Sequence, residues 1–208
     1  MRNSLTLIFS LGLLMLAGAC KHTPNETKVE DYLHLPAFTE QGIQAVIEIP
    51  AGTNHKIEYD EAQKAFKIDQ RDGEGRVIDF LPYPGNYGFI PSTYMDPKLG
   101  GDGGALDVLV IGEAAPTGTV LEARPIAALL LMDEGQLDTK IIAVPADSSR
   151  QVMKANDFLS FSMAYDGAKN IIENWFLYYD GLGTTEFRGW KDEQYALEEI
   201  RRWAIVNE

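Results

Sequence analysis

The sequence predicts an α+β fold in which a small closed β-barrel is followed by helices. Short apolar segments separated by turn residues fill the chain from about residue 45 to residue 144, a pattern typical of a small barrel. The last third changes character, because residues 166–178 and 192–206 carry apolar side chains at helical spacing. With 208 residues, 45% of them hydrophobic, the chain is long enough for one domain with a substantial core.

The expected strands are bounded by Pro, Gly, Asn and Asp, which favour turns. Residues 70–76, with Asp72-Gly73, predict a hairpin connection. Residues 80–91 hold so many prolines, glycines and aromatic residues that we expect an ordered loop, neither helix nor regular strand. Asp166 is the expected N-cap of the first helix. The expected strands are 45–50, 56–59, 65–69, 106–111, 127–132 and 140–144.

The N-terminus has the pattern of an export signal. A positive start at residues 1–3 precedes the apolar stretch 5–16, which is too short for a confident membrane span, and small residues follow up to 19. The stretch ends at Cys20, the only cysteine, and so resembles a bacterial lipoprotein signal in which Cys20 is lipidated. The alternative is an ordinary signal peptide with an incidental cysteine.

These features predict three segments. Residues 1–19 form the signal peptide, 20–31 contain the lipidated Cys20 and a polar tether, and 32–208 form the domain. The mature protein is then expected to be exported and anchored by lipid to a bacterial envelope membrane, facing the periplasm.

The chain carries a formal net charge of −13. Such a charge repels nucleic-acid phosphates and argues against a nucleic-acid partner. It does not exclude a small phosphate substrate, because bound metal ions can reverse the local sign of the potential.

Two acidic stretches, 101–110 and 129–140, each adjoin an apolar strand. Carboxylates held together repel one another unless a cation joins them, and hard oxygen ligands favour Mg²⁺, Mn²⁺ or Ca²⁺. A divalent-metal site beside Lys140, suited to a phosphate substrate, is the resulting hypothesis. A solvated acidic surface is the alternative. The acids concerned are Asp102, Asp107, Asp133, Glu134 and Asp138.

Further polar residues occur in the first half of the chain. Glu48 lies among apolar neighbours, so its side chain is expected either to enter a polar cavity or to face solvent. Lys56 and Glu58 lie on one face of a strand. Tyr83 and Tyr87 serve either loop packing or phosphate contact through their hydroxyls.

From about Ala45 to Trp203, the chain resembles the family I soluble inorganic pyrophosphatases, which hydrolyse pyrophosphate to two phosphates with Mg²⁺. The resemblance implies a five-stranded OB-like β-barrel flanked by C-terminal helices. It rests on motifs in family order, namely Val46–Pro50, Lys56-x-Glu58, Asn86-Tyr87-Gly88, Asp102 with Asp107, and Asp133-Glu134 with Asp138-x-Lys140.

The same resemblance implies a role for each matched residue. Catalytic roles fall to Glu48, Glu58, Tyr83 and Glu134. Metal ligation falls to Asp102, Asp107, Asp133 and Asp138. Substrate phosphate is expected to contact Lys56, Arg76, Tyr87, Lys140 and Tyr179, with Arg71 as the alternative to Arg76.

The chain departs from the family pattern at two positions. Gly104 replaces the middle Asp of the signature, which is usually assigned to bridge metals and activate water, and loss of a general base typically costs about 10²–10⁴-fold in rate. Asp96 is a substitute only by its nearness in sequence. After Tyr179 the family usually has Lys, whereas this chain has Asp180, which is expected to weaken binding of a highly charged anion.

The predicted function is therefore hydrolysis of pyrophosphate, a small-molecule substrate, by metal-activated water with Mg²⁺. The partners are this substrate and, through the lipid anchor, a membrane; the resemblance is compatible with a homo-oligomer, either a hexamer or a dimer. Two alternatives remain open: a degenerate protein that binds metal or pyrophosphate without hydrolysis, and a hydrolase of another phosphoanhydride such as a nucleotide.

Overall fold

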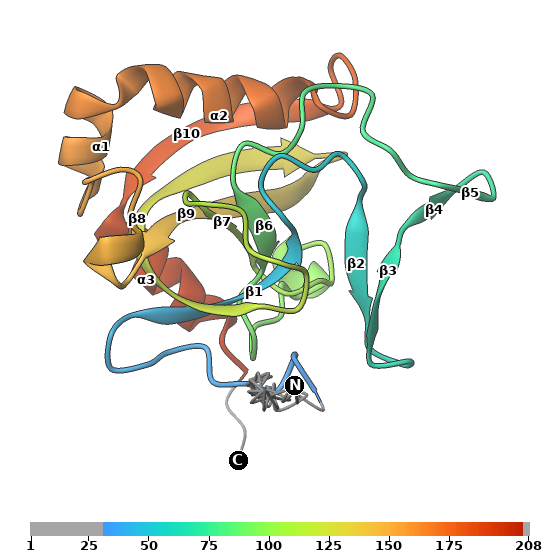
Figure 1. The fold of residues 1–208 in the computed structure, drawn as a ribbon. Coiled ribbons are helices and arrows are strands. Elements are labelled where there is room, and N and C mark those ends of the chain that lie inside the picture. Colours follow the sequence, from blue (N-terminus) through green and yellow to red (C-terminus); the bar gives the residue numbers. More distant parts are fainter. Residues whose placement is uncertain (1–30, 206–208) are drawn as a thin grey trace, which may run out of the picture.

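The computed structural model describes residues 31–205, and its main element is a closed β-barrel (Figure 1). A six-stranded sheet has the order β1-β6-β7-β9-β8-β10, and β1 also pairs with β8. The first five strands therefore close into a barrel, and β10 (Thr185–Asp192) extends the sheet from β8. This confirms the predicted five-stranded barrel. Its strands are β1 (Ile43–Ile49), β6 (Asn86–Phe89), β7 (Asp107–Val110), β8 (Val120–Asp133) and β9 (Gln136–Pro145).

Two small hairpins lie outside the barrel. The first pairs β2 (Ile57–Asp60) with β3 (Ala65–Ile68), and the second pairs β4 (Gln70–Arg71) with β5 (Glu74–Gly75). The second hairpin confirms the connection expected at residues 70–76. Figure 1 shows it projecting from the side of the molecule opposite α1.

The C-terminal part supplies three α-helices, of which α2 (Asp166–Tyr178) and α3 (Glu193–Trp203) match the expected pair. The expected N-cap was wrong. The chain turns directly from α1 (Phe158–Ala164) into α2, so Tyr165 takes the cap position without a side-chain hydrogen bond, and Asp166 lies in the first helical turn. Short 3₁₀ turns lie at η1 (Pro97–Leu99) and η2 (Ser148–Arg150).

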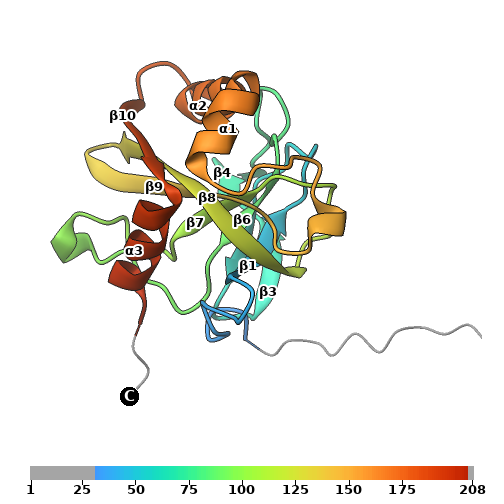
Figure 2. The same cartoon turned by 90° about the vertical axis from the view of Figure 1, so that its left-hand side faces the viewer.

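Alternate residues of the strands face two apolar cores. On β7, Val108 and Val110 belong to the core that includes Trp203 of α3, whereas Leu109 belongs to the core that includes Phe176 of α2. Figure 2 shows α3 and the α1–α2 pair against different parts of the sheet. Because both faces of the sheet are covered, the central strands have continuously apolar sequences instead of alternating apolar and polar residues.

The expectation for residues 80–91 was partly wrong, because Asn86–Phe89 forms β6, a regular strand between β1 and β7. Pairing on both sides overrides the weak strand propensity of this segment. The strand also needs its glycine: a Cβ on Gly88 would overlap the carbonyl oxygen of Val46 and lie 2.9 Å from the Glu48 nitrogen. The first part of the segment remains a loop.

Candidate active site

Strand pairing brings the two acidic stretches together at one end of the barrel. β7 and β9 are parallel neighbours, and Asp107 is the register partner of Lys140. β8 and β9 form a hairpin whose turn residues, Glu134 and Gly135, have φ of 48° and 84°. Positive φ at both central residues is the geometry of the tight hairpin turn, and it places Glu134 at the hairpin tip.

A cavity of about 410 Å³ opens at this end. The cavity is lined by nearly all the domain residues to which the family resemblance assigned a role. The two exceptions are Tyr83 and Arg76. Asp96 does not line it either, because it caps η1, where its side chain accepts a hydrogen bond from the nitrogen of Lys98. The lining includes Glu48, Lys56, Glu58, Tyr87, Asp102, Asp107, Asp133, Glu134, Asp138, Lys140 and Tyr179.

Lys140 is the centre of the polar network in this cavity. Its side chain is buried, and Nζ lies 2.5 Å from Oδ2 of Asp107, contacts Asp138, and donates to the Tyr87 hydroxyl at 3.1 Å. The Tyr87 hydroxyl in turn donates to Asp107 at 2.5 Å. Burial alone lowers the pKa of Lys140, but the charges of Asp107 and Asp138 outweigh it and hold the pKa well above the ordinary value. A permanent cation therefore stands among the carboxylates.

Glu48 reaches the cavity because it is the extra residue of a β-bulge. Ile47 pairs with Gly88 and Ile49 pairs with Tyr87, so Glu48 has no register partner on β6. Bulges re-aim side chains in this way. The Glu48 carboxylate accepts a hydrogen bond of 2.7 Å from the nitrogen of Tyr59. Burial raises its pKa to about 8, and the nearby acids Asp107 and Glu58 add to the effect. The solvent-facing alternative for Glu48 is thereby wrong.

The other residues of the first half take distinct places. Lys56 Nζ and Glu58 Oε1 are 2.8 Å apart at the cavity wall. Tyr83 is 3% exposed and packs against Tyr87 and Trp175, with ring centroids 5.2 and 4.4 Å away. Tyr83 therefore packs beside Tyr87, and its assigned role at the site stays a prediction.

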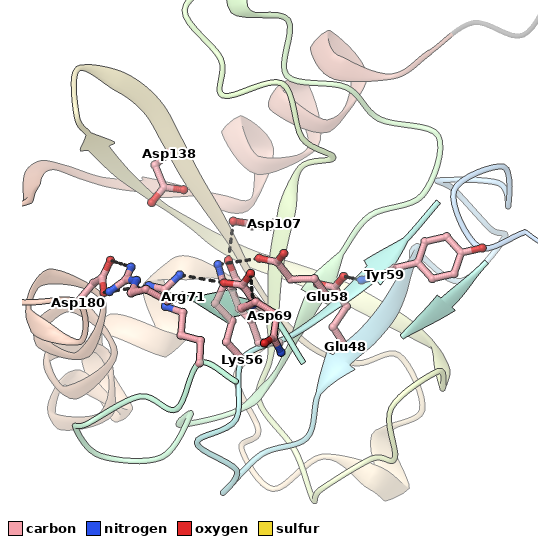
Figure 3. A network of polar contacts seen from close by, with 12 residues as sticks. Glu48, Lys56, Glu58, Tyr59, Asp69, Arg71, Asp107, Asp138 and Asp180 are labelled. Atoms are coloured by element: carbon pink, nitrogen blue, oxygen red, sulfur yellow. Dashed lines mark hydrogen bonds and ion pairs between the residues drawn. The ribbon is translucent and has the colours of Figure 1, made fainter. Parts of the chain in front are cut away.

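Arg76 lines a second cavity of about 560 Å³, together with Arg71 and Asp180. Tyr179 lines both cavities. Figure 3 shows Asp180 and Arg71 at one end of the polar network, and Glu48 and Tyr59 at the other. The two guanidinium groups therefore lie beside the first cavity and not in its wall.

The acidic residues of the first cavity suit a hard cation by their chemistry, because all four assigned aspartates offer oxygen donors. Between residues 31 and 205, no three Asp, Glu, His or Cys side chains are grouped closely enough to form a ready ligand set. Two of the carboxylates, Asp107 and Asp138, instead contact Lys140. The residues fit a divalent ion whose ligands are completed by substrate or water.

Gly104, at the cavity wall, could carry a Cβ without a clash. A Cβ built there would meet the Asp102 carboxylate at 3.4 Å or more, which is ordinary contact. Asp102 itself accepts a hydrogen bond of 2.8 Å from the nitrogen of Gly104. The backbone at this position would accept a side chain without strain.

Asn86 is a residue whose importance the sequence reasoning did not state. It is 1% exposed, and its Oδ1 accepts hydrogen bonds from the nitrogens of Ala51 and Ala115 at 3.1 and 2.7 Å. Its Nδ2 donates to the carbonyl of Glu113 at 2.9 Å. Asn86 thereby fixes the loops beside β6. Its place in the Asn-Tyr-Gly motif was the available signal.

A closed barrel with a cavity lined by aspartates, lysines and tyrosines defines a class of protein suited to a metal-bound phosphate anion. The sequence profile of the family described as inorganic pyrophosphatase matches residues 45–206. The chain belongs to the inorganic pyrophosphatase family.

Individual relatives agree with this assignment. The inorganic pyrophosphatase of Neisseria meningitidis serogroup B is 38% identical over 177 residues, covering 81% of this chain and 93% of that protein. That of Saccharolobus solfataricus is 38% identical over 166 residues, with 77% and 88% covered. The crystal structure of the Thermus thermophilus enzyme superposes with a TM-score of 0.72 at 34% identity, covering 85% of this chain and 97% of that one.

Proposed function

We propose that the protein hydrolyses inorganic pyrophosphate to two phosphates with Mg²⁺. The observation that carries the proposal is the gathering of aspartates, Lys56, Lys140, Tyr87 and Tyr179 around one cavity in a member of this family. Relatives that bear the name inorganic pyrophosphatase cover most of the chain.

Four aspartates are the residues that would hold the ion. When bound, Mg²⁺ screens phosphate oxygens and makes a coordinated water more acidic. The buried cation of Lys140 contacts Asp107 and Asp138 and opposes their negative charges at the cavity. The proposed ligands are Asp102, Asp107, Asp133 and Asp138.

The chain's cations and hydroxyls act on the substrate. Lys56, Lys140, Tyr87 and Tyr179 would donate to phosphate oxygens and stabilise the charge that develops on the leaving phosphate. Glu48, with a pKa raised to about 8, can hold or accept a proton near neutral pH. Glu58 and Glu134 remain proposed catalytic residues at the cavity wall and hairpin tip.

The test is phosphate release from pyrophosphate by a soluble version beginning at Lys21, with Mg²⁺. We expect release well above the buffer rate and its loss when the ion is chelated. If release equals the buffer rate, calorimetry with Mg²⁺ and pyrophosphate distinguishes a binding protein from one that recognises neither. A panel of nucleotides and longer phosphoanhydrides tests the remaining alternative.

We also propose that the mature protein is exported and anchored through a lipid on Cys20. The support is the sequence pattern of residues 1–20, which lie outside the described residues. Within residues 31–205, the structure contains no helix long and apolar enough to span a membrane. Labelling cells with a radioactive fatty acid should mark the parent protein and leave Cys20→Ser unmarked. Equal labelling of both would contradict the anchor.

A homo-oligomer is a further proposal, supported by the family resemblance alone. Light scattering on the soluble version gives the mass directly.

A further inference from the structure

Asp180, the anion that departs from the family pattern, is held by two arginines. Arg71 binds it with both guanidinium nitrogens, Nη1 to Oδ1 at 3.0 Å and Nη2 to Oδ2 at 3.2 Å. Arg76 Nη2 lies 2.9 Å from Oδ1. Paired contacts of this kind are among the stronger and more directional ion pairs. Figure 3 shows Arg71 reaching Asp180.

The three side chains differ in their exposure to solvent. Arg76 is 11% exposed, Asp180 27% and Arg71 56%. Burial alone raises the pKa of Asp180, but Arg71 and Arg76 outweigh it and hold the pKa below the usual range. Asp180 is therefore a permanent anion next to Tyr179, which lines the first cavity.

Arg76 is shared between two carboxylates. Its Nη1 lies 3.5 Å from Asp69, while its other terminal nitrogen contacts Asp180. Without a further cation, Arg76 would face two negative charges and contribute little net attraction for a phosphate. Arg71 supplies that cation from the β4–β5 hairpin, 109 positions before Asp180 in the sequence.

We propose that Arg71 is a positioning residue for the substrate: it neutralises Asp180, so that Arg76 is opposed by one carboxylate, Asp69, instead of two and retains positive charge for a phosphate beside Tyr179. The inference rests on the proposed function, because it concerns the affinity of the same cavity for phosphate. It also accounts for an anion at position 180: the pair of Arg71 and Asp180 is neutral, and the repulsion expected from Asp180 alone is cancelled.

A purely structural role for Arg71 makes a different prediction. If the ion pair only anchors the β4–β5 hairpin to the end of α2, losing either partner breaks the anchor, and losing both is no better than losing one. If Arg71 acts by neutralising charge, its loss leaves the Asp180 carboxylate without a neutralising partner and weakens substrate binding. Removing the Asp180 charge as well then restores substrate binding. The double variant separates the two roles.

The experiment compares the parent with Arg71→Ala, Asp180→Asn and the double variant in steady-state hydrolysis of pyrophosphate with Mg²⁺. We expect Arg71→Ala to raise KM about 10-fold with kcat nearly unchanged, because a charge is unmasked near the substrate. Asp180→Asn should keep KM at or below the parent value, and the double variant should return close to Asp180→Asn. The increase in KM for Arg71→Ala should shrink at about 0.5 M salt, where exposed charges are screened.

Two controls complete the design. Arg71→Lys, which keeps the charge but not the paired geometry, should restore much of the affinity. Arg188→Ala removes an exposed arginine on β10 that pairs with Glu186, away from both cavities, and should leave KM unchanged. A double variant as impaired as Arg71→Ala, or an Arg71→Ala protein with the parent KM, overturns the inference.

Binding of inorganic phosphate with Mg²⁺, measured by calorimetry on the same proteins, keeps this inference distinct from the proposed function. If the parent does not turn over pyrophosphate but phosphate affinity follows the expected order, the proposed function is wrong and the role of Arg71 stands. If the parent neither hydrolyses pyrophosphate nor binds phosphate, both are overturned.

Discussion

Asp107 and Lys140 are register partners across the parallel pair β7–β9, and their side-chain charges meet at 2.5 Å. This pairing joins the two acidic stretches. Lys140 is thereby the shared ion-pair partner of two partly buried carboxylates, because the same Nζ contacts Asp138.

Replacing Lys140 should therefore harm both stability and activity. Without divalent metal, Lys140→Ala leaves Asp107 and Asp138 unpaired, which is expected to cost about 3–5 kcal/mol in the free energy of unfolding. Urea unfolding measures this, and added Mg²⁺ should recover part of the loss because it supplies the missing positive charge. Lys154→Ala, an exposed site outside both cavities, is the control. Equal stability of Lys140→Ala and Lys154→Ala would contradict the assigned role.

Gly88 should tolerate no side chain. In Gly88→Ala, the new methyl group would overlap the Val46 carbonyl at the bulge that aims Glu48. We expect a loss of about 1–3 kcal/mol or more in unfolding free energy, as for other overpacked sites, together with reduced activity. Gly167→Ala, in α2 with open space around it, is the matched control and should be neutral or slightly stabilising. A parent-like Gly88→Ala protein would show that the bulge does not need the close approach.

Gly104→Asp should raise the rate of pyrophosphate hydrolysis. The position accepts a Cβ in ordinary contact with Asp102, and the carboxylate would restore an acceptor beside Asp102. We expect kcat to rise by about 10-fold or more, within the range that a general base contributes. Gly104→Ala adds a side chain without the carboxylate and should not give this increase. An unchanged kcat for Gly104→Asp would mean that the site already positions its water by other groups.

Glu48 should make the metal-free protein less stable as the pH rises. Its pKa is raised from 4.5 to about 8 in the folded state, so between these values the folded protein retains a proton that the unfolded chain releases. The contribution of Glu48 to the free energy of unfolding therefore falls between about pH 4.5 and 8, by at most about 1.4 kcal/mol per pH unit. Glu48→Gln, which keeps the acceptor for Tyr59, should gain stability relative to the parent between pH 5 and pH 8.

Urea unfolding of both proteins at the two pH values, with metal chelated, checks this prediction. Glu40→Gln, exposed and outside the cavity, is the matched control. A stability difference between parent and Glu48→Gln that does not change with pH would place the Glu48 carboxyl in contact with solvent.

The parts of the fold with local signals could be predicted from the sequence. Apolar runs predicted strands within β1, β7, β8 and β9 of the barrel, Asp72-Gly73 predicted a hairpin, and helical periodicity predicted α2 and α3. β6 could not be predicted in this way, because Asn86–Phe89 becomes a strand through its two neighbours and not through its own propensities.

For the candidate site, too, only the features with a local sequence signal could be predicted. Residue types and motif order indicated which side chains matter, and most of them line one cavity. The direction of the Glu48 side chain could not be predicted, because it depends on the β-bulge that leaves Glu48 unpaired between β1 and β6. Nor could the contact of Arg71 with Asp180, since ion pairs between distant positions leave no local pattern.

Closure of the barrel through β1 and β8, where Ile43 pairs with Ala123, has a consequence for how the protein folds. The cavity combines the β8–β9 hairpin with Glu48, Tyr87 and Asp107 from strands that are distant in sequence, so the complete cavity has no precursor in any single hairpin or helix. Chains dominated by such distant pairings fold slowly, because loop closure must precede the contacts that reward it. On refolding from urea, helical signal should return early, and catalytic turnover should return only with the last cooperative phase.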